Sequence, residues 1–437
     1  MRYYEREELE ALRREMAASD EAFPEFRFLP GWGTPIVKNG TEGRGMAFTA
    51  AVLNVAYGRP VEPLLRFLRA VPRLREADVL LLNEATYRRT PEEEGSSAFT
   101  VAEALGLNAA VGMEYLSAAE DGSNTGKQNA ILSRFPLRDA VLFPIPAGTD
   151  RLQRSKGWEM GNRNALCARI DCGGTSVVLC CTHLENRTTP QGRREQLVGL
   201  LEELDRRYPG MPVLVGGDLN TNTLDGRDNE TFLRLAREPE EQLRRIDQVE
   251  ELEPLFAAAR ERGWSWRDCS VGPGIPTRRR PGRDGTVLHM KLDWFLQRGL
   301  RCGDTERVEA FLAGDAAASE GTPGAEEISD HDAVLVRCAL YAVPAGGWFS
   351  APSLLWRRRR RPCLTPARSD AVSWGCPPLA DSPAFSRSGG LGGFVKGLEI
   401  LFYFYRQTKK NISGKISKNA QWRGDDFVEW MIFPRRH

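Results

Sequence analysis

The chain has 437 residues, of which 41% are hydrophobic and 27% are charged, as in ordinary soluble globular proteins. No apolar stretch approaches the roughly 18 residues of a membrane-spanning helix. Residues 345–437 carry 16 basic and 6 acidic side chains, which leaves 44 basic and 53 acidic side chains in residues 1–344. Because domains that bind long nucleic acids are usually basic, this acidic main part argues against such a substrate.

The first 45 residues are charged and contain no apolar segment of a secretory signal. Leu9, Leu12 and Met16 recur at helical spacing, which predicts a short amphipathic helix in an N-terminal extension, residues 1–45.

Nine cysteines are present, and none forms a CxxC pair. Four of them fall in apolar, strand-like runs, namely Cys167, Cys172, Cys180 and Cys181. Buried, reduced thiols explain this distribution better than a disulfide framework does, and they indicate a cytoplasmic protein.

From Met46 to Tyr341, apolar strand-like runs are mixed with helical segments. The predicted strands are 47–55, 78–85, 128–135, 164–171, 175–185, 211–220, 292–297 and 331–340. The predicted helices are 61–75, 99–106, 190–207 and 248–262, each with Leu or Ala at i, i+3 and i+4. The turn Cys172-Gly173-Gly174 predicts a hairpin. Because two or three strands often follow one another, the pattern favours an α+β fold of stacked sheets covered by helices.

The composition changes after about Pro344. Residues 343–437 contain an arginine run, a Gly/Ser-rich stretch and a mixed apolar and basic segment without a sustained period. We expect a basic, disordered tail, separate from a catalytic domain over 46–342. Two alternatives remain open: an anchor that binds acidic lipid or nucleic acid, or a read-through or mispredicted end.

Polar residues recur at the ends of the apolar runs. They are Asn54, Glu84, His183, Glu185, Asp218, Asn220, Asp293, Asp330 and His331. One such residue alone is usually a turn-former or a cap. A whole set in one domain indicates a catalytic edge, and its chemistry suits phosphate-ester cleavage. Carboxylate and amide oxygens are ligands for Mg²⁺ or Mn²⁺, a carboxylate or a supported imidazole activates water, and neutral donors hold the phosphate oxygens.

These residues stand in motifs that resemble the endonuclease/exonuclease/phosphatase (DNase I-like) superfamily. The motifs are LNVAYG (53–58), LLLNEA (80–85), NAILSRFP (129–136), THLEN (182–186), GGDLNTN (216–222), KLDWF (291–295) and SDHDAV (329–334). They occur in the family's order over residues 46–342. The resemblance implies a four-layer α/β/β/α sandwich of two mainly antiparallel sheets flanked by helices. It also implies a metal-dependent phosphoric ester hydrolase that uses Mg²⁺ or Mn²⁺.

The resemblance further implies roles for individual residues. Glu84 resembles the principal metal ligand, with Asn54 and Asp330 beside it. Asp218 resembles the residue that activates or orients water, and Asn220 the amide that positions the phosphate. His331 resembles the histidine at the scissile phosphate, oriented by Asp293, and His183 resembles a donor to a phosphate oxygen. Either Asp218 or the Asp293–His331 pair is the general base.

Three further residues are predicted substrate contacts, namely Asn129, Asn186 and Arg278. The family's usual Gln before the metal glutamate is Asn83 here, and the opening motif lacks the commoner Trp-Asn form, so substrate assignment does not transfer directly. We expect a small phosphate ester or a lipid head group rather than nucleic acid. A nuclease of the same fold is the alternative, and a non-catalytic binding scaffold is a third reading.

Overall fold

The computed structural model describes residues 1–43, 45–56, 60–146 and 160–341, which lie in the first of two units of the chain, Met1–Trp348. The predicted tail, residues 343–437, lies outside the described residues, as do Tyr57 and Gly58 of the LNVAYG motif. Among the helices that are described, none is long and apolar enough to span a membrane.

The first sheet is built around two apolar runs, which form the parallel neighbours β2 and β3. In the described residues it has nine strands in the order β1-β5-β6-β3-β2-β19-β15, with β4 beside β3 and β8 beside β5. All its other pairings are antiparallel. The strands are β1 (Ile36–Lys38), β2 (Ala47–Asn54), β3 (Val79–Arg89), β4 (Glu94–Ser96), β5 (Asn108–Ala118), β6 (Asn124–Ser133), β8 (Met160–Gly161), β15 (Arg301–Val308) and β19 (Ala333–Ala339).

The second sheet has five strands in the described part, in the order β14-β11-β10-β9-β7. The strands are β7 (Arg138–Pro144), β9 (Asn164–Cys172), β10 (Thr175–Thr182), β11 (Val213–Asp218) and β14 (Asp293–Arg298). Only β10 and β11 run parallel among these pairs. The predicted hairpin is β9–β10, and its loop residues Gly173 and Gly174 have φ of 62° and 85°, which glycine adopts without strain.

The two sheets face one another across a shared apolar core. Val79 and Leu81 of β3 point into that core, whereas Leu80 and Leu82 pack beneath the helices on the outer face. Successive side chains of a strand point to opposite faces, so a strand covered on both sides is apolar throughout. This explains why the run 78–85 shows no alternation of apolar and polar residues.

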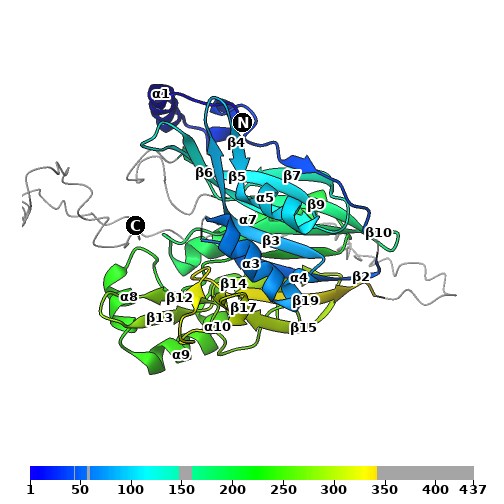
Figure 1. The fold of residues 1–437 in the computed structure, drawn as a ribbon, viewed down its shortest axis with the longest axis vertical. Coiled ribbons are helices and arrows are strands. Elements are labelled where there is room, and N and C mark those ends of the chain that lie inside the picture. Colours follow the sequence, from blue (N-terminus) through cyan, green and yellow to red (C-terminus); the bar gives the residue numbers. More distant parts are fainter. Residues whose placement is uncertain (44, 57–59, 147–159, 342–437) are drawn as a thin grey trace, which may run out of the picture. The chain divides into compact units, whose positions relative to one another are not determined.

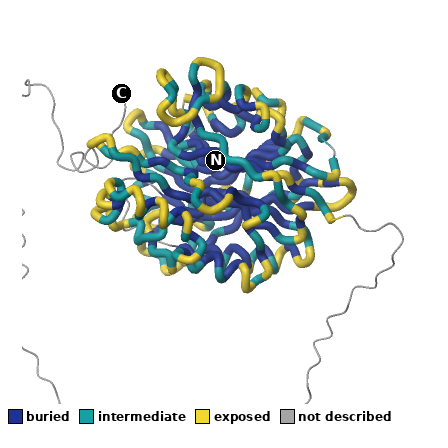
Figure 2. The backbone as a smooth tube through the Cα atoms, turned by 90° about the horizontal axis from the view of Figure 1, so that it is seen from below, coloured by how far each residue is buried: buried dark blue, intermediate teal, exposed yellow. Residues whose placement is uncertain are grey.

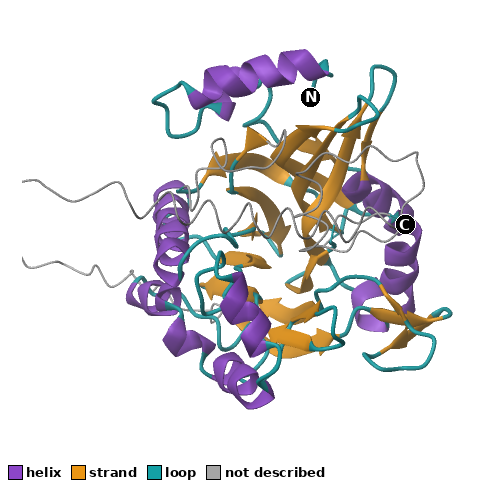
Figure 3. Ribbon diagram, turned by 90° about the vertical axis from the view of Figure 1, so that its left-hand side faces the viewer, coloured by secondary structure: helices purple, strands orange, loops and turns teal. Residues whose placement is uncertain are grey.

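Helices cover the outer face of each sheet, which makes the four-layer α/β/β/α sandwich that the resemblance implied (Figure 1, Figure 3). Leu64 and Leu68 of α3 and Val101 of α5 pack on the first sheet, and Leu200 of α7 and Phe256 of α11 pack on the second. The helices are α1 (Arg6–Ala17), α2 (Glu25–Phe28), α3 (Val61–Ala70), α4 (Pro72–Arg75), α5 (Ser97–Leu105), α7 (Pro190–Arg207), α8 (Asn229–Leu235), α9 (Pro239–Asp247), α10 (Val249–Leu252) and α11 (Pro254–Glu261).

Two small sheets complete the described fold. One is the hairpin of β12 (Arg278–Pro281) and β13 (Val287–Met290), and the other joins β16 (Phe311–Ala313), β17 (Ala316–Ala318) and β18 (Glu326–Glu327). The predicted helix 248–262 is divided into α10 and α11 at Pro254, because proline lacks the N–H that a continuous helix needs.

The N-terminal residues pack against the first sheet. Helix α1 forms as predicted, with Leu9 and Met16 buried, and β1 pairs with β5. Trp32 packs with Met113 of β5 in the same apolar cluster. Figure 2 shows the buried interior of the described chain. The four cysteines that were predicted to be buried, reduced thiols are buried and form no disulfide.

Candidate active site

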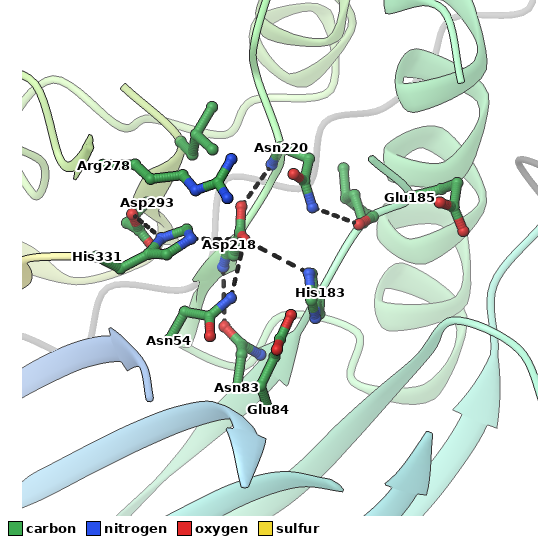
Figure 4. Close-up of polar contacts among 12 residues, drawn as sticks. Asn54, Asn83, Glu84, His183, Glu185, Asp218, Asn220, Arg278, Asp293 and His331 are labelled. Atoms are coloured by element: carbon green, nitrogen blue, oxygen red, sulfur yellow. Dashed lines mark hydrogen bonds and ion pairs between the residues drawn. The ribbon is translucent and has the colours of Figure 1, made fainter. Parts of the chain in front are cut away.

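Most of the predicted polar residues meet at one edge of the two sheets, whereas Glu185 is turned away from Asp218 (Figure 4). In the first sheet the parallel pair β2–β3 aligns Asn54 with Asn83, next to Glu84. In the second sheet β11 aligns Asp218 with Asp293, the first residue of β14. Parallel strands end at the same edge, where their antiparallel neighbours begin, so strand ends far apart in sequence converge here. The Asn54 Nδ2 donates to Asp218 Oδ2 at 3.1 Å and thereby joins the two sheets.

His331 is held between two carboxylates. Its Nδ1 lies 2.9 Å from Asp293 Oδ2, and its Nε2 lies 3.7 Å from Asp218 Oδ2. Burial opposes charge on the imidazole, but Asp293 and Asp218 outweigh it and raise the pKa of His331 to about 9. Burial also raises the pKa of Asp293 to about 6, against the opposing effect of His331. Thr277 Oγ1 donates to the same Asp293 oxygen at 2.8 Å, which fixes the carboxylate.

Asp218 is held in place by amides of neighbouring residues. Its backbone N–H donates to Asn83 Oδ1 at 2.9 Å, and its Oδ1 accepts from the Asn220 N–H at 2.8 Å. Burial alone would raise the pKa of Asp218, but His331 and His183 hold it well below its usual range. The preceding Gly217 is required by space, because a Cβ there would overlap the backbone oxygen of Thr182.

His183 forms a second imidazole–carboxylate arrangement on the other side of Asp218. Its Nε2 lies 3.4 Å from Asp218 Oδ2, and its Nδ1 lies 3.4 Å from Glu114 Oε2. Burial and Arg163 oppose charge on this imidazole, but Glu114 and Asp218 raise the pKa of His183. Glu114 is fully buried and ion-paired to Arg163. Glu114 was not among the predicted residues. The sequence feature that could have indicated it is an acidic residue inside the apolar run of β5.

Glu84 points into the site from an irregular point of β3. The register of β3 against β6 shifts between Leu82 and Ala85, and Glu84 has φ of 59°. Such a bulge redirects a side chain that a regular strand would place elsewhere. Lys127 Nζ donates to Glu84 Oε2 at 2.9 Å. Burial opposes the charge of Glu84, but Lys127 and then His183 lower its pKa.

Asp330 and Arg278 form an ion pair beside His331. Arg278 donates from Nε and a terminal nitrogen to Asp330 Oδ2, at 3.1 and 2.9 Å. Burial opposes the charge of Arg278, but Asp330 and then Asp218 raise the pKa of the guanidinium. Arg278 is the first residue of the strand β12.

The sequence matches the model of the endonuclease/exonuclease/phosphatase family over residues 51–331. The chain belongs to this family. Members of the family are hydrolases that act on phosphate esters and are generally dependent on divalent metals, so the match supports phosphoesterase activity in general. No curated protein matches the sequence.

Several solved structures are similar to this chain. An endonuclease/exonuclease/phosphatase from Beutenbergia cavernae has 17% identity and a TM-score of 0.44, covering 69% of this chain and 73% of its own. The human Nocturnin catalytic domain with bound sulfate has 16% identity and a TM-score of 0.43, covering 71% and 98%. A mannosyl-6-phosphatase from Bacteroides thetaiotaomicron has 15% identity and a TM-score of 0.41, covering 67% and 100%. The family assignment rests on the family model and not on these similarities.

The three predicted substrate residues lie in different surroundings. Arg278 faces the cluster (Figure 4). Asn129 is fully buried, where its Oδ1 accepts from Asn83 at 2.7 Å and its Nδ2 donates to Asn164 at 3.1 Å. Asn186 is exposed just after His183 and Glu185. Their roles as substrate contacts stay predictions.

The donors present fit a small divalent cation of the kind this family uses. Glu84 and Asp330 supply carboxylate oxygens and Asn54 an amide oxygen, which are the hard ligands that Mg²⁺ prefers. Both carboxylates already hold a cationic side chain, Lys127 on Glu84 and Arg278 on Asp330, so each is a place where positive charge is stabilised. Asp218, Asp293 and His331 also place one ligand atom each within 4.8 Å of one another. The Nδ1 of His331, however, faces Asp293 at hydrogen-bond distance. This contact favours Glu84, Asp330 and Asn54 over the group with His331 as the metal ligands.

Proposed function

We propose that this chain is a divalent-metal-dependent phosphoesterase that hydrolyses a phosphodiester or phosphomonoester by in-line attack of water. The observation that carries the proposal is the buried His331 between Asp293 and Asp218 at the same edge as Glu84. An imidazolium, an ionised aspartate and oxygen ligands side by side are the groups that phosphate-ester hydrolysis needs.

Each residue then has a definite task. Asp218 accepts the proton of the attacking water, because it is the carboxylate that two imidazoles keep ionised. His331, charged between two carboxylates, donates a hydrogen bond to the phosphate, and Asp293 keeps its ring in position. His183 donates to a second phosphate oxygen, and Asn220 positions the phosphate. In this proposal the general base is Asp218, and the Asp293–His331 pair is the alternative.

Glu84, Asn54 and Asp330 are the proposed ligands of Mg²⁺ or Mn²⁺. When bound, the ion polarises the phosphoryl group and stabilises the leaving oxygen. Lys127 and Arg278 balance the negative charges of Glu84 and Asp330, respectively. These two side chains therefore reduce the repulsion within the acidic cluster before substrate binds.

The direct test is hydrolysis of bis-p-nitrophenyl phosphate by the purified chain with Mg²⁺ or Mn²⁺. The rate should vanish in EDTA and return when the metal is restored. His331→Ala and Asp218→Asn should each abolish most of the rate, whereas His289→Ala should not, because His289 lies on β13 and pairs with Glu320 outside the cluster. Unchanged rates in both site variants would remove the assignment.

A nuclease of the same fold is the second candidate. Its support is the arginine run of β12, of which Arg278 lies beside the site, and the basic composition of residues 345–437. The acidic composition of residues 1–344 favours a small phosphate ester or a lipid head group instead. Cleavage of plasmid or abasic DNA that persists after truncation at Pro344 would promote the nuclease over the small-ester hydrolase.

A further inference from the structure

Two cysteines face one another across the pairing of β15 and β19. Cys302 lies directly opposite Cys338 in the antiparallel register. Their Sγ atoms are 3.3 Å apart, and both thiols are free. Opposite residues of an antiparallel pair have Cα atoms about 4.5 or 5.5 Å apart, and a disulfide bridges Cα separations of roughly 4.4–6.8 Å. The backbone of the two strands therefore already has a spacing that a disulfide can bridge.

Cys302 is the accessible member of the pair. Its side chain is partly exposed, whereas Cys338 is buried. The strand β15 stands at the end of the strand order of the first sheet, and its register against β19 is irregular just after Gly303. Within the described residues β15 is thus paired on one side only, and a strand with few contacts shifts more readily than an interior one. The two sulfurs can approach one another without disturbing the centre of the sheet.

The surroundings of the two sulfurs make their reactivity unequal. Hydrogen bonding by the thiols of Cys269 and then Cys338 lowers the pKa of Cys302, against the effect of burial. The contact with Cys302, followed by burial, raises the pKa of Cys338. Within the pair the negative charge therefore lies on the accessible sulfur and the proton on the buried one. The thiolate is the nucleophilic form of cysteine, so Cys302 is the sulfur that an oxidant reaches first.

We propose that Cys302 and Cys338 are a modification site at which hydrogen peroxide forms a reversible disulfide. The Cys302 thiolate attacks one peroxide oxygen, the O–O bond breaks, and the other oxygen leaves as hydroxide, which gives a sulfenic acid on Cys302. The sulfur of Cys338 then attacks the sulfenic sulfur, the S–S bond forms, and the S–O bond breaks. The proton of Cys338 leaves with the departing oxygen. Two thiols are oxidised and one peroxide is reduced to two waters, and exchange with a small thiol reverses the step.

A second cysteine pair of the chain has the same place in a sheet but no access. Cys167 and Cys180 are also directly opposite one another, in the antiparallel pairing of β9 and β10. Both are fully buried in the apolar cluster beneath α7. A peroxide in solution does not reach either sulfur while the chain is folded. This pair is therefore a matched internal control for the accessibility of Cys302.

The proposed modification is independent of the active site. Cys338 stands seven residues after His331, which is about 23 Å along an extended chain. Neither cysteine contacts the residues assigned to hydrolysis. Failure of the disulfide would leave the proposed phosphoesterase untouched, and absence of hydrolysis would leave the disulfide untouched.

The experiment treats the reduced, folded, full-length chain with hydrogen peroxide, alkylates the remaining thiols in denaturant and maps the peptides by mass spectrometry. Trypsin cleaves after Arg301, Arg307 and Arg337, so Cys302 and Cys338 fall in separate peptides that only a disulfide joins. We expect this joined peptide, lighter than the sum of its two parts by two hydrogen atoms, and its loss after treatment with dithiothreitol. The peptides of Cys167 and Cys180 should stay fully alkylated.

One variant traps the intermediate. Cys338→Ala keeps an apolar side chain at the buried position, and peroxide should then leave a sulfenic acid on Cys302 that dimedone labels. Dimedone should not label Cys302 in the wild-type chain once the disulfide has formed. Complete alkylation of both cysteines after peroxide, or a bond from Cys302 to Cys269 instead, would overturn the proposal. Oxidation of Cys167 and Cys180 at the same rate would also overturn it, because accessibility would then not select the pair.

Discussion

Replacing Asp293 by asparagine should separate activity from stability. The carboxylate is fully buried, and its Oδ2 accepts from Thr277 and faces His331 Nδ1 at 2.9 Å, while its Oδ1 has no hydrogen-bond partner among the described residues. Asparagine has nearly the same shape and keeps an oxygen acceptor, but it removes the negative charge that favours the imidazolium. The pKa of His331 should therefore fall from its raised value.

The size of the effect follows from the hydrogen bond that is weakened. A hydrogen bond to a charged group contributes roughly 1.5–3 kcal/mol. If His331 makes full use of it in the transition state, kcat/KM should decrease roughly 10- to 150-fold. Stability should not decrease in parallel, because burial already disfavours the charge of Asp293, as its raised pKa of about 6 indicates.

The assay is hydrolysis of bis-p-nitrophenyl phosphate, with urea unfolding of the same preparation. Asp315→Asn is the matched control, because that side chain is 91% exposed and should change neither measurement. A kcat/KM within threefold of wild type in a folded Asp293→Asn protein would refute the role of the carboxylate. A large loss of stability would refute the view that its charge is disfavoured by burial.

Three further changes test the stability of the fold. Glu25 is buried, and burial raises its pKa from 4.5 to about 7, so the folded state favours the protonated form. The free energy of unfolding should therefore fall by about 3 kcal/mol as the pH rises from below 4.5 to above 7. Glu25→Gln should remove that fall in urea titrations at about pH 5 and 8.5. Asn83→Ala removes hydrogen bonds at 2.7, 2.9 and 3.0 Å and should cost about 3 kcal/mol of stability together with most of the activity, and an unchanged urea midpoint would contradict this. Gly217→Ala should prevent folding because its Cβ meets the fixed backbone of Thr182, whereas Gly216→Ala meets only side chains and should be milder; equal soluble yields would argue against this contact.

Much of the fold could be predicted because its signals are local. The runs that became β2, β3, β9, β10 and β11 are apolar enough to be recognised without their partners. The strand β5 was missed, since its sequence NAAVGMEYLSA contains small residues and an acid that weaken the apolar signal. Its place is fixed by pairing with β6 on one side and β1 on the other, which are contacts that no local pattern reports.

The sequence by itself determined which residues stand at strand ends and in which order, and this was enough to predict Asp218, Asp293 and His331 as one group. The tertiary structure decided how they meet. Asn54 and Asp218 are 164 residues apart, and only the stacking of two sheets brings them to 3.1 Å. It also decided the surroundings of the three consecutive arginines of β12: alternation along the strand buries Arg279 against Asp332, whereas among the described residues Arg280 contacts the ring of Phe232.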